Sequence, residues 1–406
     1  MMFHRKKFDW GIAILLLILM IFGVVAIFTA SSTTIGQQRS TQSFWWKQLI
    51  FVGLAIVSIV LLLRLPMPIF DVLILPLYWV NILALVVVLF TPAVGGAHRW
   101  FRLFGLNYQP SESAKLFTIL MVARAISKDN LNEFKQLLYG LGLIILPVAL
   151  IIIEPDFGTT LVFIIALLAM YLAADLPLFY LLLIISPVIS IISSVHWIGV
   201  ILWMGLFVFL LVRMRLSWVT ITISGIFNLF LALIMPVFWN SLKDYQQNRI
   251  LTFLDPMRDP LGAGYHIIQS KIAVGSGEII GKGWLQGTQK NMNFLPEHHT
   301  DFIFSVIGEE FGFLGSLLLL GVFALFFWKL INAMGDIKVR ERKIATAGIL
   351  AYLLFQTFIN IGMNIGLVPA TGIPLPFISY GGSSLLINAL TVGVVLKYLN
   401  ERGFMK

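Results

Sequence analysis

The feature that most constrains the fold is a series of apolar runs, each about 20 residues long, that fills most of the 406 residues. A helix of about 20 residues crosses the hydrocarbon core of a bilayer, whereas a membrane β-barrel would show alternating segments of about ten residues. Only 12% of the residues are charged, against about 25% in soluble domains. The sequence therefore predicts an all-α, polytopic transmembrane helix bundle.

The distribution of Lys and Arg predicts how these runs cross the membrane, because short loops rich in the two residues stay in the cytoplasm. Basic residues at 4–7 place the N-terminus inside, and those after 396 place the C-terminus inside as well. The apolar stretch 177–215 is too long for one span and is divided at 193–197. With about twelve spans, every short basic loop falls on the same side of the membrane.

The expected spans lie at about 9–30, 44–63, 69–90, 110 onward, 137–153, 157–174, two within 177–215, then 218–239, 301–328, 345–367 and 380–398. Lys329 and Lys338 are assigned to the basic loop after the tenth span. The longest non-apolar segment, 240–300, is left outside, where its amphipathic and glycine-rich pieces are expected to form interfacial helices and turns. The whole chain, 1–406, is expected to be a single membrane domain.

Composition also excludes some classes of function. The chain has no cysteine, so it has neither disulfides nor a thiol nucleophile. The net charge of +9 could suggest a nucleic-acid ligand, but the basic residues are distributed as membrane topology requires. No nucleic-acid partner is expected.

An ionisable cluster leads directly into the apolar run after residue 300. Glu297, His298, His299 and Asp301 stand close together in the sequence, and such groups at a membrane boundary are costly to desolvate, which makes them candidates for a functional site. His and Asp are good metal ligands, although neighbouring positions point in different directions, so only one or two of them could bind one ion. Alternatively, Thr300 caps the helix and Asp301 is a first-turn anion.

A second charged pair lies in the stretch QPSESAKL. Glu112 and Lys115 are three residues apart, so on a helix that begins at Pro110 they share a face. Because Lys115 lies about a turn inside a span, its ammonium needs a partner or a polar cavity. The pair is either a structural ion pair or a cavity wall that handles substrate.

Four other motifs can be interpreted from the sequence. The glycines at 262–283 (GAG, GSG, GKG) either form turns in a loop or present amides to a pyrophosphate headgroup; they do not fit a nucleotide-binding loop. Asp156 or a threonine in EPDFGTT can cap the next helix. Arg99 and Arg102 are interfacial anchors or headgroup contacts, and the glycines of GIPLPFISYGG allow close backbone approach.

Together these motifs resemble one family. The stretches GGAHRWF, QPSESAKL, EPDFGTTLV, GKGWLQGTQKNMNFLPEHHTDFIFSVIGEEFG and NIGMNIGLVPATGIPLPFISYGG are similar to those of the SEDS proteins (shape, elongation, division and sporulation), and they occur in the family's order. The elements GKGW, GTQ and FLPE favour the elongation branch over the division branch. Two departures stand out: an inserted helical pair at about 176–217, added to a ten-span core, and Glu278 in place of a usual glycine.

The resemblance implies a peptidoglycan glycosyltransferase that polymerises lipid II during cell elongation. It implies a multi-pass protein of the bacterial cytoplasmic (inner) membrane, with both termini in the cytoplasm and the active site on the outer face. The implied partners are a class B penicillin-binding protein that supplies transpeptidation, proteins of the elongation machinery, membrane lipids, and the undecaprenyl-linked glycan. The family's essential aspartate corresponds to Asp301, and its buried Glu and Lys pair corresponds to Glu112 and Lys115.

The chemistry requires few groups. An acceptor hydroxyl must lose its proton, and a carboxylate at a low-dielectric boundary can act as the general base; Asp301 is the candidate. Cations must balance the charge on the leaving pyrophosphate, and a divalent ion (Mg or Mn) is a further possibility. The candidates for substrate binding are Glu112, Lys115, Arg249, Lys271, Lys282 and His299.

Two other classes of protein compete with the polymerase. A lipid II flippase or transporter is supported by charged residues within spans, and the third class is a non-catalytic scaffold for cell-wall assembly. Against the flippase, the polar residues concentrate in the outside loop and do not line a path across the bilayer. Against the scaffold, that loop is richer in ionisable groups than adhesion requires.

Overall fold

The computed structural model describes residues 8–35, 38–41, 44–92, 98–103, 106–241, 247, 251–252, 255–260, 262, 264–288 and 299–400. The chain separates into two compact units. Unit 1 comprises Met1–Ala174 and Asp259–Lys406, and unit 2 comprises Asp175–Arg258. Thirteen α-helices lie in the described ranges, so the predicted all-α class is confirmed.

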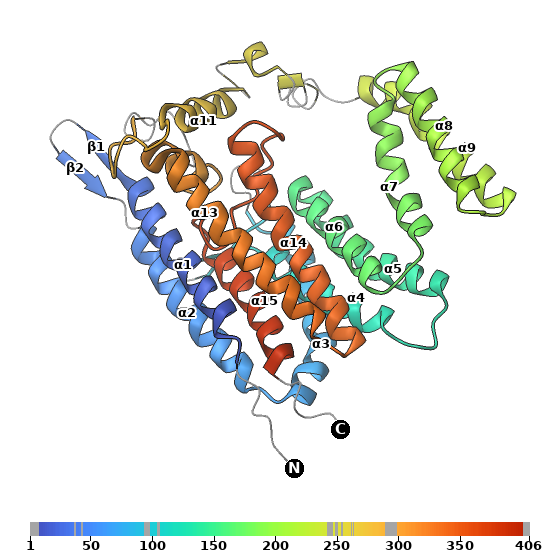
Figure 1. Ribbon diagram of the computed structural model, residues 1–406, viewed down its shortest axis with the longest axis horizontal. Coiled ribbons are helices and arrows are strands. Elements are labelled where there is room, and N and C mark those ends of the chain that lie inside the picture. Colours follow the sequence, from blue (N-terminus) through green and yellow to red (C-terminus); the bar gives the residue numbers. More distant parts are fainter. Residues whose placement is uncertain are drawn as a thin grey trace. The chain divides into compact units, whose positions relative to one another are not determined.

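Unit 1 contains ten of these helices and two short antiparallel hairpins (Figure 1). The helices are α1 (Trp10–Ser31), α2 (Phe44–Arg64), α3 (Met67–Val88), α4 (Pro110–Ile126), α5 (Glu133–Ile153), α6 (Phe157–Ala173), α11 (Tyr265–Ser276), α13 (Ile303–Gly335), α14 (Arg340–Asn364) and α15 (Gly382–Asn400). The hairpins are β1 (Ser32–Ile35) with β2 (Gln38–Thr41), and β3 (Phe101–Leu103) with β4 (Leu106–Tyr108).

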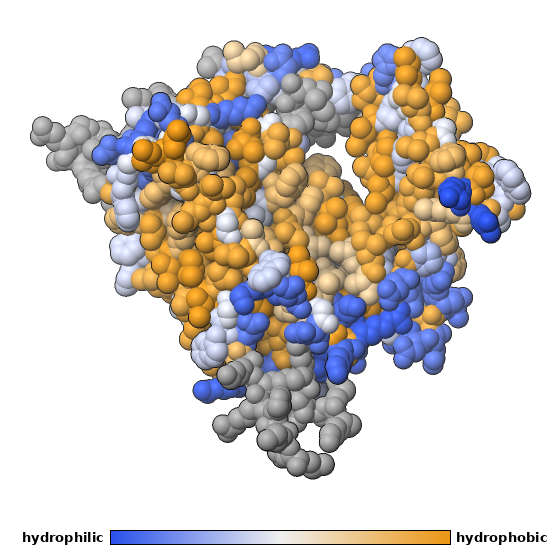
Figure 2. Space-filling model, viewed as in Figure 1, coloured by the Kyte–Doolittle hydropathy of each residue, from blue (hydrophilic) through white to orange (hydrophobic). Residues whose placement is uncertain are grey.

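Eight helices in the described part of the chain are long and apolar enough to cross a membrane: α1, α2, α3, α5, α9, α13, α14 and α15. The other four helices that correspond to expected spans, α4, α6, α7 and α8, have 16 or 17 residues each. Figure 2 shows hydrophobic side chains over the sides of the helices of unit 1, with hydrophilic ones nearer the helix ends. The chain is therefore a multi-pass helix bundle, as its apolar runs predict.

Local signals set several of the helix ends. Pro110 occupies the first turn of α4, where its missing N–H costs nothing. Asp156 is the N-cap of α6, because its Oδ1 accepts a hydrogen bond from the Thr159 amide at 3.1 Å. The predicted cap in EPDFGTT is thus present. In contrast, Lys329 lies within α13 and not in the loop that follows it.

The interior of unit 1 is built around α14 and α15. In the most apolar 18-residue stretch of each of these two helices, 72% of the residues are buried, compared with 22% in α2. α14 packs against α4, α6 and α13, and α15 packs against α2 and α4. Polar side chains carried by α14 and α15 are therefore held inside protein, where each of them needs a hydrogen-bonding partner.

Unit 2 is formed by α7 (Leu178–Ser193), α8 (Trp197–Arg213), α9 (Trp218–Ser241) and the short helix η1 (Pro256–Arg258). The turn between α7 and α8 lies at the predicted position. Ser190 links the three helices: its hydroxyl donates to Asn228 Oδ1 at 2.7 Å and accepts from Trp203 Nε1 at 2.8 Å. The predicted helical pair thus forms part of a three-helix unit.

The helix α13 is interrupted at Gly312, whose φ of 66° and ψ of −162° are not helical. A positive φ of this size suits glycine, which has no Cβ to clash. The apolar run predicts a continuous span at 301–328, so the interruption is a feature that the structure adds.

Candidate functional site

Asp301 lies just before α13, and its backbone is held by two asparagines of α14. The Asp301 carbonyl oxygen accepts hydrogen bonds from Asn360 Nδ2 at 3.0 Å and from Asn364 Nδ2 at 3.1 Å. Both asparagines are fully buried. Asn364 Oδ1 also accepts from the Ser305 amide at 3.1 Å, in the first turn of α13. The backbone before the helix and the helix start are thereby fixed to the same side chain.

The two residues before Asp301 are fixed to the loop that precedes α15. Ser379 Oγ donates to the Thr300 carbonyl oxygen at 2.6 Å, and the Tyr380 amide donates to the His299 carbonyl oxygen at 2.9 Å. Three consecutive residues, 299–301, therefore have their carbonyl groups bonded to elements at 360–380. Thr300 is not the N-cap of α13, because Phe302 occupies that position.

The Asp301 carboxylate is half-buried and lies beside Gly372. A Cβ built on Gly372 would be 3.5 Å from Asp301 Oδ2, and the φ of +71° at this residue is one that glycine adopts readily. Asp301 lies two residues before the first residue of α13, where the helix dipole favours a negative charge. An aspartate here can accept a proton from a substrate hydroxyl brought to the same edge.

The His299 imidazole packs against aromatic rings. Its centroid lies 4.4 Å from that of Phe44, with the planes 13° apart, and 5.7 Å from that of Tyr380. Among the described residues no group of three His, Cys, Asp or Glu side chains could hold a metal ion. Glu297 and His298 lie outside the described residues, so the metal hypothesis for the full cluster is left as a prediction.

Glu112 and Lys115 form a buried ion pair on α4. Lys115 Nζ lies 2.9 Å from Glu112 Oε1, and their side chains are 1% and 4% exposed. The ammonium also lies 5.7 Å from the centroid of the Tyr352 ring, at a distance that allows a cation–π interaction. The face shared by the two residues, predicted from their spacing, is confirmed.

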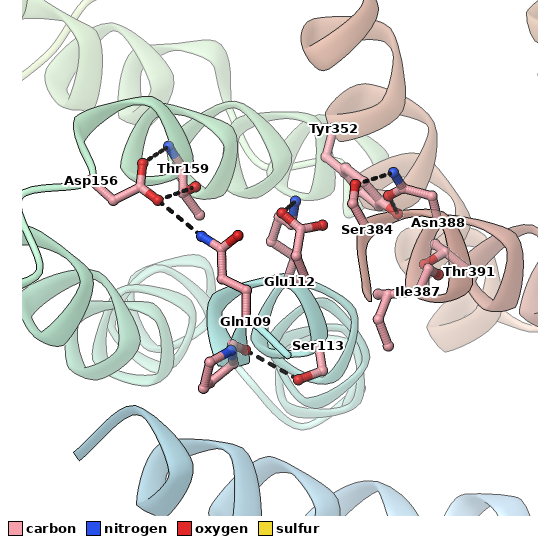
Figure 3. Close-up of polar contacts among 12 residues, drawn as sticks. Gln109, Glu112, Ser113, Asp156, Thr159, Tyr352, Ser384, Ile387, Asn388 and Thr391 are labelled. Atoms are coloured by element: carbon pink, nitrogen blue, oxygen red, sulfur yellow. Dashed lines mark hydrogen bonds and ion pairs between the residues drawn. The ribbon is translucent and has the colours of Figure 1, made fainter. Parts of the chain in front are cut away.

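Further polar side chains surround this pair (Figure 3). Glu112 lies between a group near α6 and a group on α14 and α15. In the first group, Gln109 Nε2 donates to Asp156 Oδ2 at 3.4 Å. In the second, the Tyr352 hydroxyl donates to Asn388 Oδ1 at 3.1 Å. Lys115 also lines a cavity of about 10 Å³ among apolar residues of α4, α5 and α6, which has room for about one water molecule.

The loop 371–373 connects the surroundings of Asp301 with the start of α6. Gly372 lies beside the Asp301 carboxylate, while the Thr371 carbonyl oxygen would be 3.0 Å from a Cβ on Gly158. Asn360 Nδ2 donates to the Ile373 carbonyl oxygen at 2.8 Å, in addition to the Asp301 carbonyl oxygen. The same asparagine thus holds both Asp301 and the loop beside it.

Arg99 joins the segment after α3 to the turn between α5 and α6. Its Nε donates to the Glu154 carbonyl oxygen at 2.8 Å and its Nη2 to the Pro155 carbonyl oxygen at 2.5 Å. The Glu154 carboxyl is 1% exposed. Burial, and then the charge of Asp156, raise its pKa to about 8, although Arg99 opposes the shift. This carboxyl is therefore mostly protonated at pH 7.

Two glycines of the series, Gly277 and Gly281, are explained by close packing of backbones. A Cβ on Gly277 or Gly281 would collide with the backbone of α13, at Gly308 and Glu310 respectively. The amides of Gly281, Lys282 and Gly283 donate to carbonyl oxygens within the protein. These three amides are therefore not available to bind a pyrophosphate. Gly275 lies within α11 and not in a turn.

The structure explains why a glycine is usual at the position of Glu278. Its φ is +49°, in the left-handed region that glycine occupies at little cost. A glycine would suit this position better.

The predicted basic residues have different surroundings. Lys271 is exposed on α11, with its side chain lying against Gly366. Lys282 Nζ lies 2.7 Å from Glu309 Oε1, and its predicted contact with the substrate stays a prediction. Arg249 lies outside the described residues. Glu309 and Glu310, both 1% exposed, were not among the predicted site residues, although two acidic residues within an apolar run are a signal that the sequence carries.

Comparison with known proteins identifies relatives along the whole chain. The model of the FtsW/RodA/SpoVE family, described as cell cycle protein, matches residues 9–200 and 198–402. The chain belongs to the FtsW/RodA/SpoVE family. This is the SEDS family that the sequence motifs resemble.

Individual members of the family align over almost their full length. The peptidoglycan glycosyltransferase MrdB of Escherichia coli is 34% identical over 401 residues, which are 98% of this chain and 95% of that protein. The peptidoglycan glycosyltransferase RodA of Treponema pallidum is 31% identical over 436 residues, 98% of each chain. Similarity to RodA and MrdB agrees with the elongation branch that the motifs favour.

A solved structure shares the SEDS fold of this chain. It comes from work on the structural coordination of polymerization and crosslinking by a peptidoglycan synthase complex. The match has a TM-score of 0.73 and 29% identity, and it covers 98% of this chain and 99% of that one. The helix bundle described above is therefore the family's fold.

Proposed function

We propose that this peptidoglycan glycosyltransferase polymerises lipid II on the outer face of the bacterial cytoplasmic membrane, with Asp301 as the general base. Its full-length similarity to MrdB and RodA makes the chain a member of that enzyme class. The observation that carries the role of Asp301 is the fixation of its backbone by Asn360 and Asn364, beside a glycine that leaves room at the carboxylate. A catalytic base needs such a fixed position.

In the proposed reaction, the 4-hydroxyl of the acceptor sugar attacks the anomeric carbon of a lipid-linked donor. The hydroxyl proton passes to the Asp301 carboxylate, the new glycosidic bond forms, and the bond to the lipid pyrophosphate breaks. Lys271 and Arg249, or a divalent cation, balance the charge on the leaving pyrophosphate. His299 forms part of the aromatic wall beside the base.

Glu112 and Lys115 are proposed to bind polar parts of the substrate from inside the bundle. Their burial and the unbonded Glu112 Oε2 support this role, because an acceptor without a partner in the described residues can take a substrate hydroxyl. Apolar surfaces between helices would hold the polyprenyl tails of lipid II and of the growing undecaprenyl-linked glycan.

The proposed topology has twelve spans, with both termini in the cytoplasm. Under it, α7 and α8 are a helical pair added to a ten-span core, and 240–300 is an extracytoplasmic loop whose helix α11 lies at the membrane interface. The short loops rich in Lys and Arg then all fall on the cytoplasmic side, which supports this count.

The proposed partner is a class B penicillin-binding protein that crosslinks the strands, within the machinery of cell elongation. The structural relative from a complex that coordinates polymerization and crosslinking supports this proposal. Membrane lipids surround the bundle, and no nucleic acid is involved.

The test is polymerisation of lipid II by the purified protein together with its partner. Asp301→Asn keeps the shape of the side chain and removes its basicity, so the rate should fall by at least about a hundredfold while folding and partner binding persist. Asp129→Asn, which changes an exposed aspartate, is the control and should leave the rate unchanged. Polymer made at the normal rate by Asp301→Asn would exclude Asp301 as the base.

A further inference from the structure

The break in α13 is repaired by the loop 278–283. In an unbroken helix, the amides of Phe313 and Leu314 would donate to the carbonyl oxygens of Glu309 and Glu310. Instead, the two amides donate to the carbonyl oxygens of Glu278 and Ile279, at 2.9 and 3.0 Å.

The two carbonyl groups that the break leaves unbonded also find partners in the loop. The Glu309 carbonyl oxygen accepts from the Lys282 amide at 3.0 Å, and the Glu310 carbonyl oxygen accepts from the Gly283 amide at 3.1 Å. All four groups that lost helical partners are thus bonded to one loop, as a broken helix within a membrane protein requires.

Side chains extend this attachment toward residue 288. Glu309 Oε1 accepts three hydrogen bonds: from Lys282 Nζ at 2.7 Å, from the Thr288 amide at 2.8 Å and from Thr288 Oγ1 at 2.8 Å. The Leu285 amide donates to Glu310 Oε2 at 3.2 Å. A buried carboxylate is costly unless it is paired and hydrogen-bonded. The Glu309 carboxylate is therefore well placed to hold the loop on α13.

Gly287 lies directly over the two carboxylates. A Cβ at this position would be 3.0 Å from Glu309 Oε2 and 3.3 Å from Glu310 Oε1. The loop can approach the acidic pair this closely only because position 287 has no side chain.

The attachment has a consequence for the chain that carries Asp301. Residue 288 is bonded to Glu309 on one side, and residues 299–301 are bonded to α14 and to the loop before α15 on the other. We propose that Glu309, acting through Lys282 and Thr288, is a positioning residue for glycosyl transfer. It fixes the start of the chain that leads to Asp301, while Asn360 and Asn364 fix the end. The inference rests on the proposed role of Asp301 as the base.

The experiment compares hydrogen exchange and kinetics in the full-length protein with its partner. Glu309→Gln removes the charge that pairs with Lys282, so amides at 282–288 should exchange at least about tenfold faster. The rate at saturating lipid II should fall by about ten- to a hundredfold, with KM changed less than about threefold, because misplacement of a catalytic group acts on the chemical step.

Variants of Lys282 provide the matched comparison. Lys282→Met should reproduce both effects, and Lys282→Arg, which keeps the positive charge, should restore most of the rate. Because the Lys282 side chain is 27% exposed, these variants carry the test if Glu309→Gln fails to fold. Asp129→Asn is again the control, because it removes one partner of the exposed ion pair between Asp129 and Arg340.

Two outcomes would overturn the proposal. In the first, amides at 282–288 keep their protection in Glu309→Gln and Lys282→Met. In the second, the amides at 282–288 lose their protection in these variants, but polymerisation continues at the normal rate. Failure of the proposed base is a separate result, because it would appear as normal activity in Asp301→Asn, whatever the exchange at 282–288.

Discussion

Glu112 and Glu154 are both buried glutamates, but their environments differ. Glu112 is paired with Lys115 at 2.9 Å, whereas neither carboxyl oxygen of Glu154 has a hydrogen-bond partner among the described residues. An unpaired buried carboxyl avoids the cost of its charge by staying protonated, as the raised pKa of Glu154 indicates. Replacing Glu112 should therefore leave the Lys115 charge without its partner. Replacing Glu154 should remove a carboxyl that is already mostly uncharged at pH 7.

Glu154 should make the stability of the protein depend on pH. Its pKa in the folded protein, about 8, lies above the ordinary value of 4.5, so the folded state binds more protons than the unfolded state between these values. The free energy of unfolding should fall as the pH rises from about 4.5 to about 8, by an amount on the order of a few kcal/mol, and then level off.

Glu154→Gln should flatten this dependence, because the amide cannot ionise. The measurement is the thermal unfolding midpoint in detergent at several pH values between 5 and 9. Glu133→Gln, at an exposed carboxylate, should keep the slope of the wild type. Equal slopes in wild type and Glu154→Gln would show that Glu154 is not the group responsible.

The Glu112 and Lys115 pair should be strongly coupled. Glu112→Gln or Lys115→Met alone leaves one buried charge without its partner, at a cost of about 3–5 kcal/mol. The double variant should cost clearly less than the sum of the two. Thermal unfolding of the four proteins measures the coupling, and additive losses would contradict it.

At the scale of elements, the loop 278–288 and the broken helix α13 form one structure. The loop carbonyl and amide groups replace the helical bonds lost at Gly312. Two glycines of the series that could have bound a pyrophosphate, Gly277 and Gly281, allow this close approach of two backbones. Their substitution should therefore weaken the attachment of the loop and leave the other helices intact.

Gly281→Ala should be destabilising, whereas Gly275→Ala should be tolerated. Gly281 has a φ of +89°, and its new Cβ would collide with the Glu310 carbonyl oxygen; a Cβ on Gly275 meets nothing within 4 Å. We expect a loss of about 1–3 kcal/mol for the first variant and no loss for the second, which lies within α11. Thermal unfolding and proteolysis at the loop distinguish them.

Glu278→Gly should stabilise the same loop. The residue now adopts a φ of +49°, which costs a non-glycine residue roughly 1 kcal/mol. The unfolding midpoint should rise slightly and the loop amides should exchange more slowly. A lower midpoint would mean that the glutamate side chain contributes more than its backbone conformation costs.

At the scale of the whole molecule, the arrangement of spans decides which side of the membrane carries Asp301. The turn between α7 and α8 tests the proposed topology most directly, since the two helices have only 16 and 17 residues. A reporter fused at Ser194 should indicate the outside of the membrane. A cytoplasmic signal there would contradict the twelve-span arrangement.

The proposed partner gives a second test at this scale. Polymerisation of lipid II should be higher when the purified protein is combined with a class B penicillin-binding protein than when it is alone. The assay is the yield of glycan from labelled lipid II, with an unrelated membrane protein in place of the partner as the control. Equal yields would remove the requirement for that partner.

The sequence by itself determined the helices and their order. The length of an apolar run and the positions of Pro110 and Asp156 act locally, because the bilayer thickness and the helix ends impose the same requirements in any fold. For the same reason the spacing of Glu112 and Lys115 was enough to predict their pairing. The resemblance of the motifs then supplied the family and directed attention to Asp301.

Only the tertiary structure decided which distant residues meet. The bonds of Asn360 and Asn364 to Asp301, the pairing of Lys282 with Glu309, and the repair of α13 by the loop 278–283 all join residues far apart in the chain. No local pattern encodes such contacts, because they depend on how the helices pack. Packing also explains why Gly277 and Gly281, which the sequence left compatible with a pyrophosphate site, lie at a close contact between two backbones.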